Sequence, residues 1–287
     1  MTIHSSAAKG AEGKSIAATP NYLGQLKYTA NSIALKDGRQ CEVWELNVSP
    51  DDACVADWAS RFRQTYCLDA DIDVLREGTG YSRAEYLCRF VFPDEKVAPG
   101  PGIRAGDFAE LLIADYTEFV LGYWVPREKY AEKGSRNESV KGVDIIGFKL
   151  KDPGSPDPSD SMLAFEVKAQ LTDSKYTDRL QAAVDDSAKD YLRAADTLAA
   201  MKRRMHKAQK AEEVKVVQRF QNLVDHPYEL HSGAAAMLSG KSFDVEALKN
   251  TETTNHNNVQ RLALVVIKGE DLMTLAHSLY KRAADEA

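Results

Sequence analysis

Two short apolar runs in the middle of the chain carry ionisable residues at positions where a buried strand normally has only hydrophobic ones. The first run, residues 142–148, contains Asp144, and the second, residues 163–170, contains Glu166 and Lys168. Side chains alternate along a strand, so Glu166 and Lys168, two positions apart, point to the same face. The pattern predicts two strands that bring charged side chains to one site.

The loop between the two runs, residues 149–161, contains three prolines and a glycine, which do not suit a strand interior. We therefore expect the chain to turn back there like a hairpin. If the two strands pair antiparallel, Asp144 and Glu166 come to neighbouring positions at one end of the sheet, close enough to share an ion.

The spacing of hydrophobic residues predicts the other elements. An amphipathic helix that contains Glu110 ends near Gly122. Elsewhere we expect strands at 40–48, 123–125 and 261–267, helices at 50–66 and 269–284, a helix or a strand at 83–92, one protruding helix or two helices across 174–220, and an irregular or mobile loop at 233–258. The last strand is expected to join the sheet that carries Asp144 and Glu166, and mixed connectivity of this kind predicts an α/β fold.

These elements divide the chain into three predicted parts. Residues 1–19 are rich in Ala, Ser, Gly and Lys and predict a flexible N-terminus. Residues 20–100 form an N-terminal α+β portion whose exposed faces are candidates for contact with a partner. Residues 101–287 form the core, with long helical additions in an insertion around 174–258. With 287 residues and 44% apolar content, the chain can bury one substantial core.

Asp144, Glu166 and Lys168 together indicate a metal-dependent phosphodiesterase. Two carboxylates can hold a hard cation such as Mg²⁺ or Mn²⁺, and a nearby lysine can orient or help to deprotonate the attacking water. The alternative is a buried ion pair between Glu166 and Lys168, with Asp144 at a turn. Buried charges are rare unless they are paired or bind a metal, so this alternative explains the pair but explains Asp144 less well.

Two further polar residues are candidates for the site. Glu110 flanks the apolar stripe of its helix and is a candidate additional metal ligand or positioning group. Asp107 and Glu110 also have the spacing of a capping box, which requires no catalytic role. Gln170 follows Lys168 on the same strand face and either contacts substrate or water or makes a surface hydrogen bond.

The net charge of −6 is unusual for a protein that holds DNA unaided, because affinity for phosphate comes mainly from Lys and Arg. Either basic residues cluster locally or a partner delivers the DNA. A basic run in the predicted helical region offers Lys202, Arg203, Arg204 and Lys207 as a DNA track, and a solvated helix face is the commoner meaning of such a run.

Several classes of protein do not fit the sequence. The four cysteines have neither the spacing of a zinc knuckle nor a C-x-x-C pair, so we expect reduced thiols. No apolar segment resembles a signal peptide or approaches the length of a membrane span, which predicts a cytoplasmic protein with no membrane partner. The region around Gly100 and Gly102 lacks the ending of a phosphate loop, so any DNA unwinding is expected from another chain.

The order of these motifs resembles the PD-(D/E)xK nuclease superfamily and, more narrowly, the HamA family of Hachiman anti-phage defence. The resemblance rests on the stretches 104–112, 141–148 and 165–170 and covers about 104–190. It implies a PD-(D/E)xK restriction-endonuclease-like core, which is a mixed central sheet flanked by helices. One departure is that Val143, and not proline, precedes Asp144.

The resemblance also implies roles for individual residues and for a partner. Asp144, Glu166 and Lys168 match the catalytic positions, and Glu110 and Gln170 match accessory ones. The implied activity is weakly sequence-specific, Mg²⁺- or Mn²⁺-dependent cleavage of DNA. The implied partner is a DNA helicase, HamB, which forms a complex with the nuclease. When the helicase senses abnormal DNA, it releases the nuclease. A stand-alone restriction or repair endonuclease and a catalytically inactive adaptor subunit are the alternatives.

Overall fold

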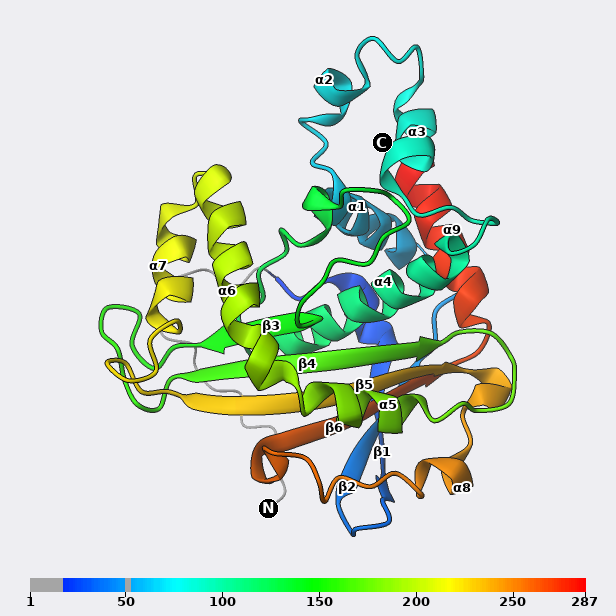
Figure 1. Cartoon of the computed structure of the whole chain (residues 1–287). Helices are drawn as coiled ribbons and strands as arrows, with labels where there is room; N and C mark the ends of the chain where they lie inside the picture. The colour runs from blue at the N-terminus through cyan, green and yellow to red at the C-terminus, as the bar shows by residue number, and fades with distance from the viewer. Residues whose placement is uncertain (1–17, 50–52) are drawn as a thin grey trace.

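The two apolar runs that carry the acids form an antiparallel pair at one edge of a six-stranded sheet. The computed structural model describes residues 18–49 and 53–287, and the strand order is β1-β2-β6-β5-β4-β3 (Figure 1). The strands are β1 (Leu26–Ala34), β2 (Gln40–Leu46), β3 (Ile145–Lys149), β4 (Ser161–Gln170), β5 (Glu229–Ser239) and β6 (Leu262–Gly269). The pairs β1–β2 and β3–β4 are antiparallel and the others are parallel. The predicted hairpin-like return and the place of the last strand in the same sheet are both confirmed.

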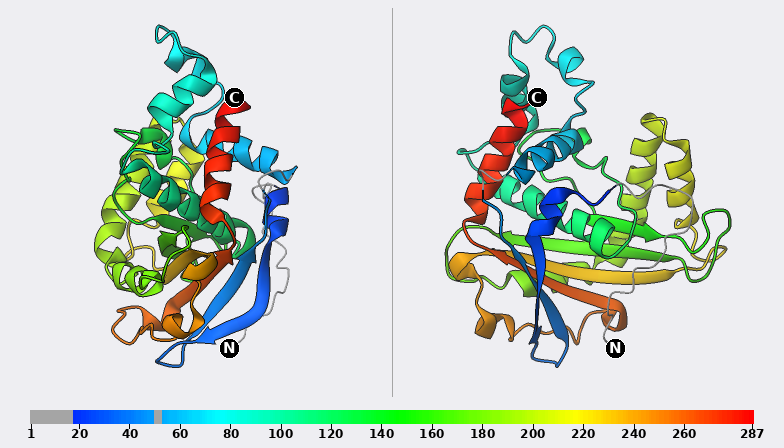
Figure 2. Two further views of the ribbon diagram at one scale, coloured as in Figure 1. Left: turned by 90° about the vertical axis from the view of Figure 1, so that its right-hand side faces the viewer. Right: turned by 180° about the vertical axis from the view of Figure 1, so that it is seen from behind.

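Helices cover both faces of this mixed sheet. They are α1 (Cys54–Tyr66), α2 (Ile72–Arg76), α3 (Arg83–Tyr86), α4 (Gly100–Asp115), α5 (Arg179–Ser187), α6 (Asp190–Lys207), α7 (Ala211–Arg219), α8 (Val245–Leu248) and α9 (Leu272–Asp285). Figure 2 shows α1, α4 and α9 together on one side of the sheet, where Phe165 of β4 packs into their core. Ala164 faces the opposite side and packs in a cluster with residues of α6 and α7. The α/β fold is confirmed, and a core of the PD-(D/E)xK type stays a prediction.

The prediction of an irregular loop at 233–258 is wrong over its first part, where β5 runs as a buried strand between β4 and β6. The strand is covered on both faces, and residues 234–236 are alanines with no exposed surface. Gly233 pairs with Phe165, and a Cβ atom at Gly233 would lie 2.5 Å from the Phe165 ring. Tight packing therefore requires small residues here, and small residues give no hydrophobic pattern that marks a strand.

Two other predictions change in detail. Residues 174–220 fold as three helices, α5, α6 and α7, and not as one or two. The predicted strand at 123–125 is wrong, because only Trp124 forms a bridge, to Phe148 of β3. The predicted end of the Glu110 helix near Gly122 is confirmed, since a π-helical turn continues α4 to Val120.

The N-terminal portion shares the sheet and the core with the rest of the chain. Strand β2 pairs in parallel with β6, and α1 packs against α9. The ambiguous segment 83–92 is helical, because α3 continues into a π-helical turn at Leu87–Val91. Nearly all of the predicted flexible segment 1–19, and the predicted helix start at 50–52, lie outside the described residues. Each helix in the described part of the chain is too short or too polar to cross a bilayer.

Candidate active site

Asp144 is held directly beside the strand that carries Glu166. The ladder between β3 and β4 pairs Ile145 with Phe165, so one step further along Asp144 comes opposite Glu166. The Asp144 carboxylate accepts a hydrogen bond of 2.9 Å from the backbone N–H of Val167. The two acids therefore lie at neighbouring positions, as the hairpin pattern predicted.

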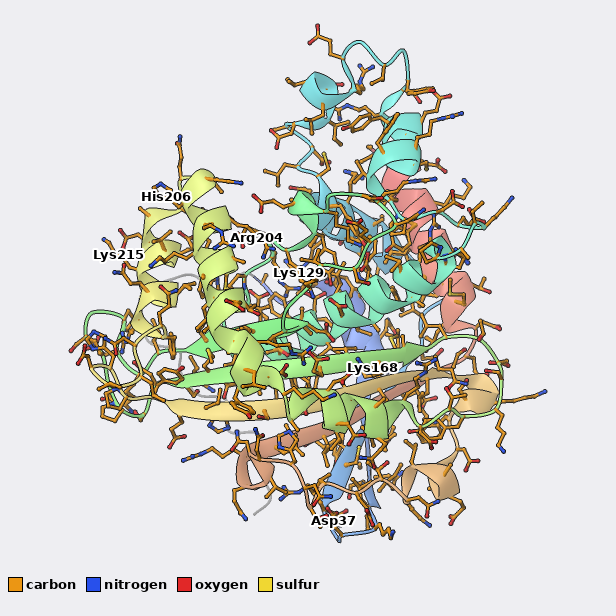
Figure 3. The ribbon with its side chains drawn as sticks, in the orientation of Figure 1. Asp37, Lys129, Lys168, Arg204, His206 and Lys215 are labelled. Atoms are coloured by element: carbon orange, nitrogen blue, oxygen red, sulfur yellow. The ribbon has the colours of Figure 1, made fainter. Side chains whose placement is uncertain are left out.

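Lys129 links Asp144 to Glu110. Glu110 stands on α4, and Lys129 lies in the segment between α4 and β3; Figure 3 shows Lys129 between α4 and α6. The Lys129 Nζ atom lies 2.7 Å from Glu110 Oε2, 3.0 Å from the backbone oxygen of Asp144 and 3.8 Å from Asp144 Oδ1. The Tyr130 hydroxyl donates to the same Glu110 oxygen at 2.6 Å. One ammonium group thus lies between two carboxylates.

The electrostatics of this group favour an additional cation. Burial raises the pKa of Asp144 well above its usual value, the negative charges of Glu110 and Glu166 raise it further, and Lys129 opposes them. Burial alone would lower the pKa of Lys129, but Glu110 and Asp144 raise it overall. Several acids with too little positive charge among them are a common feature of metal and catalytic sites.

Glu166 is 2% exposed and lies in a network of ion pairs on the face of β4 opposite α4. Its Oε1 atom lies 2.9 Å from Arg193 Nη2, and its Oε2 atom lies 3.6 Å from Lys168 Nζ. The Lys168 ammonium also lies 2.8 Å from Asp186 Oδ2. The ion pair between Glu166 and Lys168, which the sequence offered as an alternative, is therefore present. Asp144 still lies next to this pair, so the ion pair does not rule out a metal site.

Sequence reasoning missed Lys129, Asp190 and Arg193. Asp190 begins α6 and is 3% exposed, and Arg193 joins it to Glu166 through contacts of 2.5 Å and 2.9 Å. Burial and then the charge of Asp190 raise the pKa of Glu166. Asp190 and Arg193 are two of many charged residues on α6 and do not stand out in the sequence. No local pattern marks Lys129 either.

The capping-box alternative for Asp107 and Glu110 is wrong. Helix α4 begins at Gly100, with Pro101 in its first turn, so Asp107 lies well inside the helix. The buried Asp107 carboxyl accepts a hydrogen bond of 2.6 Å from the Tyr66 hydroxyl and pairs with Lys133.

The Gln170 amide is occupied by the loop that follows β4. Its Nε2 atom donates to the backbone oxygen of Lys175 at 2.7 Å, and its Oε1 atom accepts from the backbone N–H of Thr177 at 3.1 Å. These contacts hold the loop against the strand. A contact of Gln170 with substrate stays a prediction.

The basic residues of the predicted DNA track lie in the last turns of α6. Arg204 and Lys207 both pair with Glu132, each at 3.2 Å. Arg204 also lines a pocket together with Asp144, and Figure 3 shows it on the side of α6 nearer to Lys129. Arg204 therefore lies on the side of the acids, whereas Lys202 donates to the side chain of Gln221 after α7. Contact of these four residues with DNA stays a prediction.

Asp144 and Glu166 offer a donor set that suits Mg²⁺ or Mn²⁺. Within residues 18–49 and 53–287, no three Asp, Glu, His or Cys side chains converge as a metal-binding group. Mg²⁺ is usually held by one or two carboxylates and completes its shell with water and substrate phosphates. Asp144 and Glu166 lie at neighbouring positions, and Lys129 connects Asp144 to a third carboxylate, Glu110. This arrangement fits that requirement.

Comparison with protein-family models finds a match to the family described as HamA over residues 21–283. The matched range spans nearly the whole chain and includes all six strands of the sheet. It extends well beyond the stretch 104–190 on which the sequence motifs rested, into the N-terminal portion. No curated protein matches the chain.

Proposed function

The chain belongs to the HamA family of Hachiman defence proteins, and on that premise we propose that it is a metal-dependent, weakly sequence-specific DNA nuclease, the effector of the defence system. The observation that carries this proposal is the placement of Asp144 beside Glu166, with Lys168 on the same strand face as Glu166. Paired carboxylates beside a lysine suit hydrolysis of a phosphodiester. We also propose that the sheet and its helices form a PD-(D/E)xK core.

The side chains have distinct roles in the proposed reaction. Mg²⁺ or Mn²⁺ held by Asp144 and Glu166 would polarise a phosphoryl oxygen and lower the pKa of a water molecule. Lys168 would position the attacking water and stabilise the negative charge that develops, for which its ammonium has to leave Asp186, 2.8 Å away. Glu110, on α4, would add a third carboxylate near the metal. Gln170 would fix the end of β4 through its bonds to the loop that follows the strand.

Lys129 and Arg193 would serve as counter-charges for these acids. Buried carboxylates without a partner are costly, and each of these cations lies within 3 Å of a carboxylate of the group. They keep the acids together in the folded chain before DNA arrives. A DNA phosphate that enters the site would then meet both cations.

The proposed defence role includes a helicase partner. A net charge of −6 supports delivery of DNA by another chain, since a strongly DNA-binding protein usually carries an excess of basic residues. We propose that a HamB-type helicase forms a complex with this chain, holds the nuclease in check and releases it when it senses abnormal DNA.

Plasmid degradation by the purified chain tests the proposed activity. Cleavage is expected with Mg²⁺ or Mn²⁺ and not with EDTA, and it should be lost in Glu166→Gln, Glu166→Ala and Lys168→Ala. Glu246→Gln is a matched control, because Glu246 is an exposed acid on α8. Metal-dependent cleavage that persists in all three site variants would refute the assignment, and a chain inactive under every condition would favour the adaptor alternative.

A further inference from the structure

On the premise that the chain is a DNA nuclease, we propose that a cavity beside Glu166 holds an unstacked nucleobase of single-stranded DNA next to the phosphate that is cleaved. The cavity has a volume of about 370 Å³ and is lined by the start of α6, by β4 and β5 and by the segment before β6. That volume lies in the range of sites that bind small molecules, about 300–1,000 Å³.

The cavity adjoins the site through two residues. Ala164 lines it and lies two positions before Glu166 on the same face of β4, which places them about 7 Å apart along the strand. Asp190 also lines the cavity, and Arg193 bridges Asp190 and Glu166. A nucleotide whose phosphate lies at Glu166 can therefore place its base in the cavity.

Two aromatic rings contribute to the walls. Tyr191, on the first turn of α6, is 58% exposed although it is a large aromatic residue. Tyr228 is half-buried and held edge-on against Phe220, with ring centroids 4.9 Å apart. Neither tyrosine hydroxyl has a hydrogen-bond partner among the described residues. One free ring and one fixed ring offer surfaces on which a base can stack, and stacking of this kind contributes about 1–3 kcal/mol per base.

Polar groups at the cavity match the edge of a base. The Asn257 side-chain nitrogen donates to the backbone oxygen of Ala188 at 2.8 Å, and that of Asn258 donates to the backbone oxygen of Leu230 at 3.0 Å. In the described part of the chain the oxygen of each amide has no donor, so both are available as acceptors. Arg261, which also lines the cavity and pairs with Glu229 through one of its nitrogens, adds further N–H donors. Bases outside a duplex are recognised by such donors and acceptors on their edges together with aromatic stacking.

The charge of the cavity favours a base over a phosphate. The charged residues that line the cavity are one acid, Asp190, and one base, Arg261, and they are paired with Arg193 and Glu229 respectively, whereas phosphate sites collect positive charge. A base inside a duplex is stacked and paired and cannot enter, so the cavity selects single strands or extruded nucleotides. A partner that unwinds DNA would supply such a substrate.

Fluorescence anisotropy at low ionic strength, with Ca²⁺ in place of Mg²⁺ to fill the carboxylate site, tests the proposal under conditions in which cleavage is not expected. The probes are a fluorescein-labelled single strand, the same strand in a duplex, and a single strand of equal length made of abasic residues. Wild type is expected to bind the intact single strand at least fivefold more tightly than the abasic one. Tyr191→Ala should remove most of that difference, because the stacking of the base on the ring is lost. Tyr191→Trp should retain the difference, because tryptophan also offers an aromatic ring.

Tyr28→Ala is the matched control, since Tyr28 is also an exposed tyrosine but lies on β1 at the opposite edge of the sheet. It should bind like wild type. If wild type bound intact and abasic strands equally, or Tyr191→Ala bound like wild type, the cavity would not be a base site, even with the nuclease activity intact. Failure of wild type to bind the intact single strand would likewise overturn the base site, whereas the nuclease proposal, in which a partner delivers the DNA, is tested separately by the plasmid assay.

Discussion

The backbone N–H of Val167 donates a hydrogen bond of 2.9 Å to the carboxylate of Asp144. This bond ties the residue that precedes β3 to the middle of the Glu-x-Lys stretch of β4. Asp144 therefore stays beside Glu166 although the two carboxyls repel each other when ionised, which is one of the causes that raise the pKa of Asp144. The carboxylate has two functions in our proposal, because one oxygen accepts this bond while the charge of the group binds the cation.

Asp144→Asn separates those two functions. The amide oxygen of asparagine can still accept the bond from Val167, so we expect a melting temperature close to that of wild type. The negative charge is lost, so metal-dependent plasmid cleavage should fall by about 100-fold or more, since a bound metal contributes several kcal/mol to such reactions. Thermal denaturation and a cleavage time course measure the two effects. Wild-type cleavage by a folded Asp144→Asn protein would show that Asp144 is not a ligand.

Lys129→Met tests the counter-charge between Glu110 and Asp144. Two carboxylates lose their buried partner, which should lower the free energy of unfolding without metal by about 3 kcal/mol. Mg²⁺ should then raise the melting temperature more than it does in wild type, because no ammonium competes for the acids. Lys215→Met is the control, since Lys215 is an exposed residue of α7 far from the site (Figure 3). An unchanged or smaller effect of Mg²⁺ on Lys129→Met would contradict the role given to Lys129.

Asp107 gives the fold a defined dependence on pH. Burial raises the pKa of its carboxyl from 3.8 to about 6, although Lys133 opposes the shift. Between pH 4 and 6 the carboxyl of residue 107 is ionised in the unfolded chain but still protonated in the folded chain. Wild type therefore loses stability relative to Asp107→Asn as the pH rises through this range. The loss should approach about 3 kcal/mol by pH 7, at 1.36 kcal/mol per pKa unit. Urea unfolding of both proteins at several pH values measures it, and a constant difference between them would argue against the raised pKa.

Gly233→Ala tests the buried strand β5. The added Cβ atom would lie 2.5 Å from the Phe165 ring, so the ring or the backbone has to shift. We expect a loss of about 1–3 kcal/mol in the free energy of unfolding. Gly106→Ala, inside α4 with open space around the new atom, should instead gain up to about 1 kcal/mol. Equal stabilities of the two variants in denaturant unfolding would speak against this packing.

The sequence predicted those parts of the fold and site that depend on local patterns. The hairpin of β3 and β4 followed from two apolar runs around a proline-rich loop, and Asp144, Glu166 and Lys168 were recognised because they interrupt those runs. Strand β5 was missed because close packing against β4 requires glycine and alanine, which carry no hydrophobic alternation.

Residues brought to the site by tertiary structure could not be predicted in this way. Lys129 reaches Glu110 and Asp144 from a segment without regular structure. Asp190 lies on a helix whose many charged residues look solvated in sequence, and only the folded chain shows that it is buried beside Glu166. The capping-box alternative for Asp107 failed because α4 begins seven residues earlier, at Gly100.

Calorimetric titration with Mn²⁺ tests most directly whether Asp144 and Glu166 bind one cation together. Wild type and the control Glu246→Gln are expected to bind Mn²⁺ with the same affinity, whereas Asp144→Asn and Glu166→Gln should each lose most of the heat of binding. Equal Mn²⁺ binding by all four proteins, or none by wild type, would contradict a metal site at these two acids.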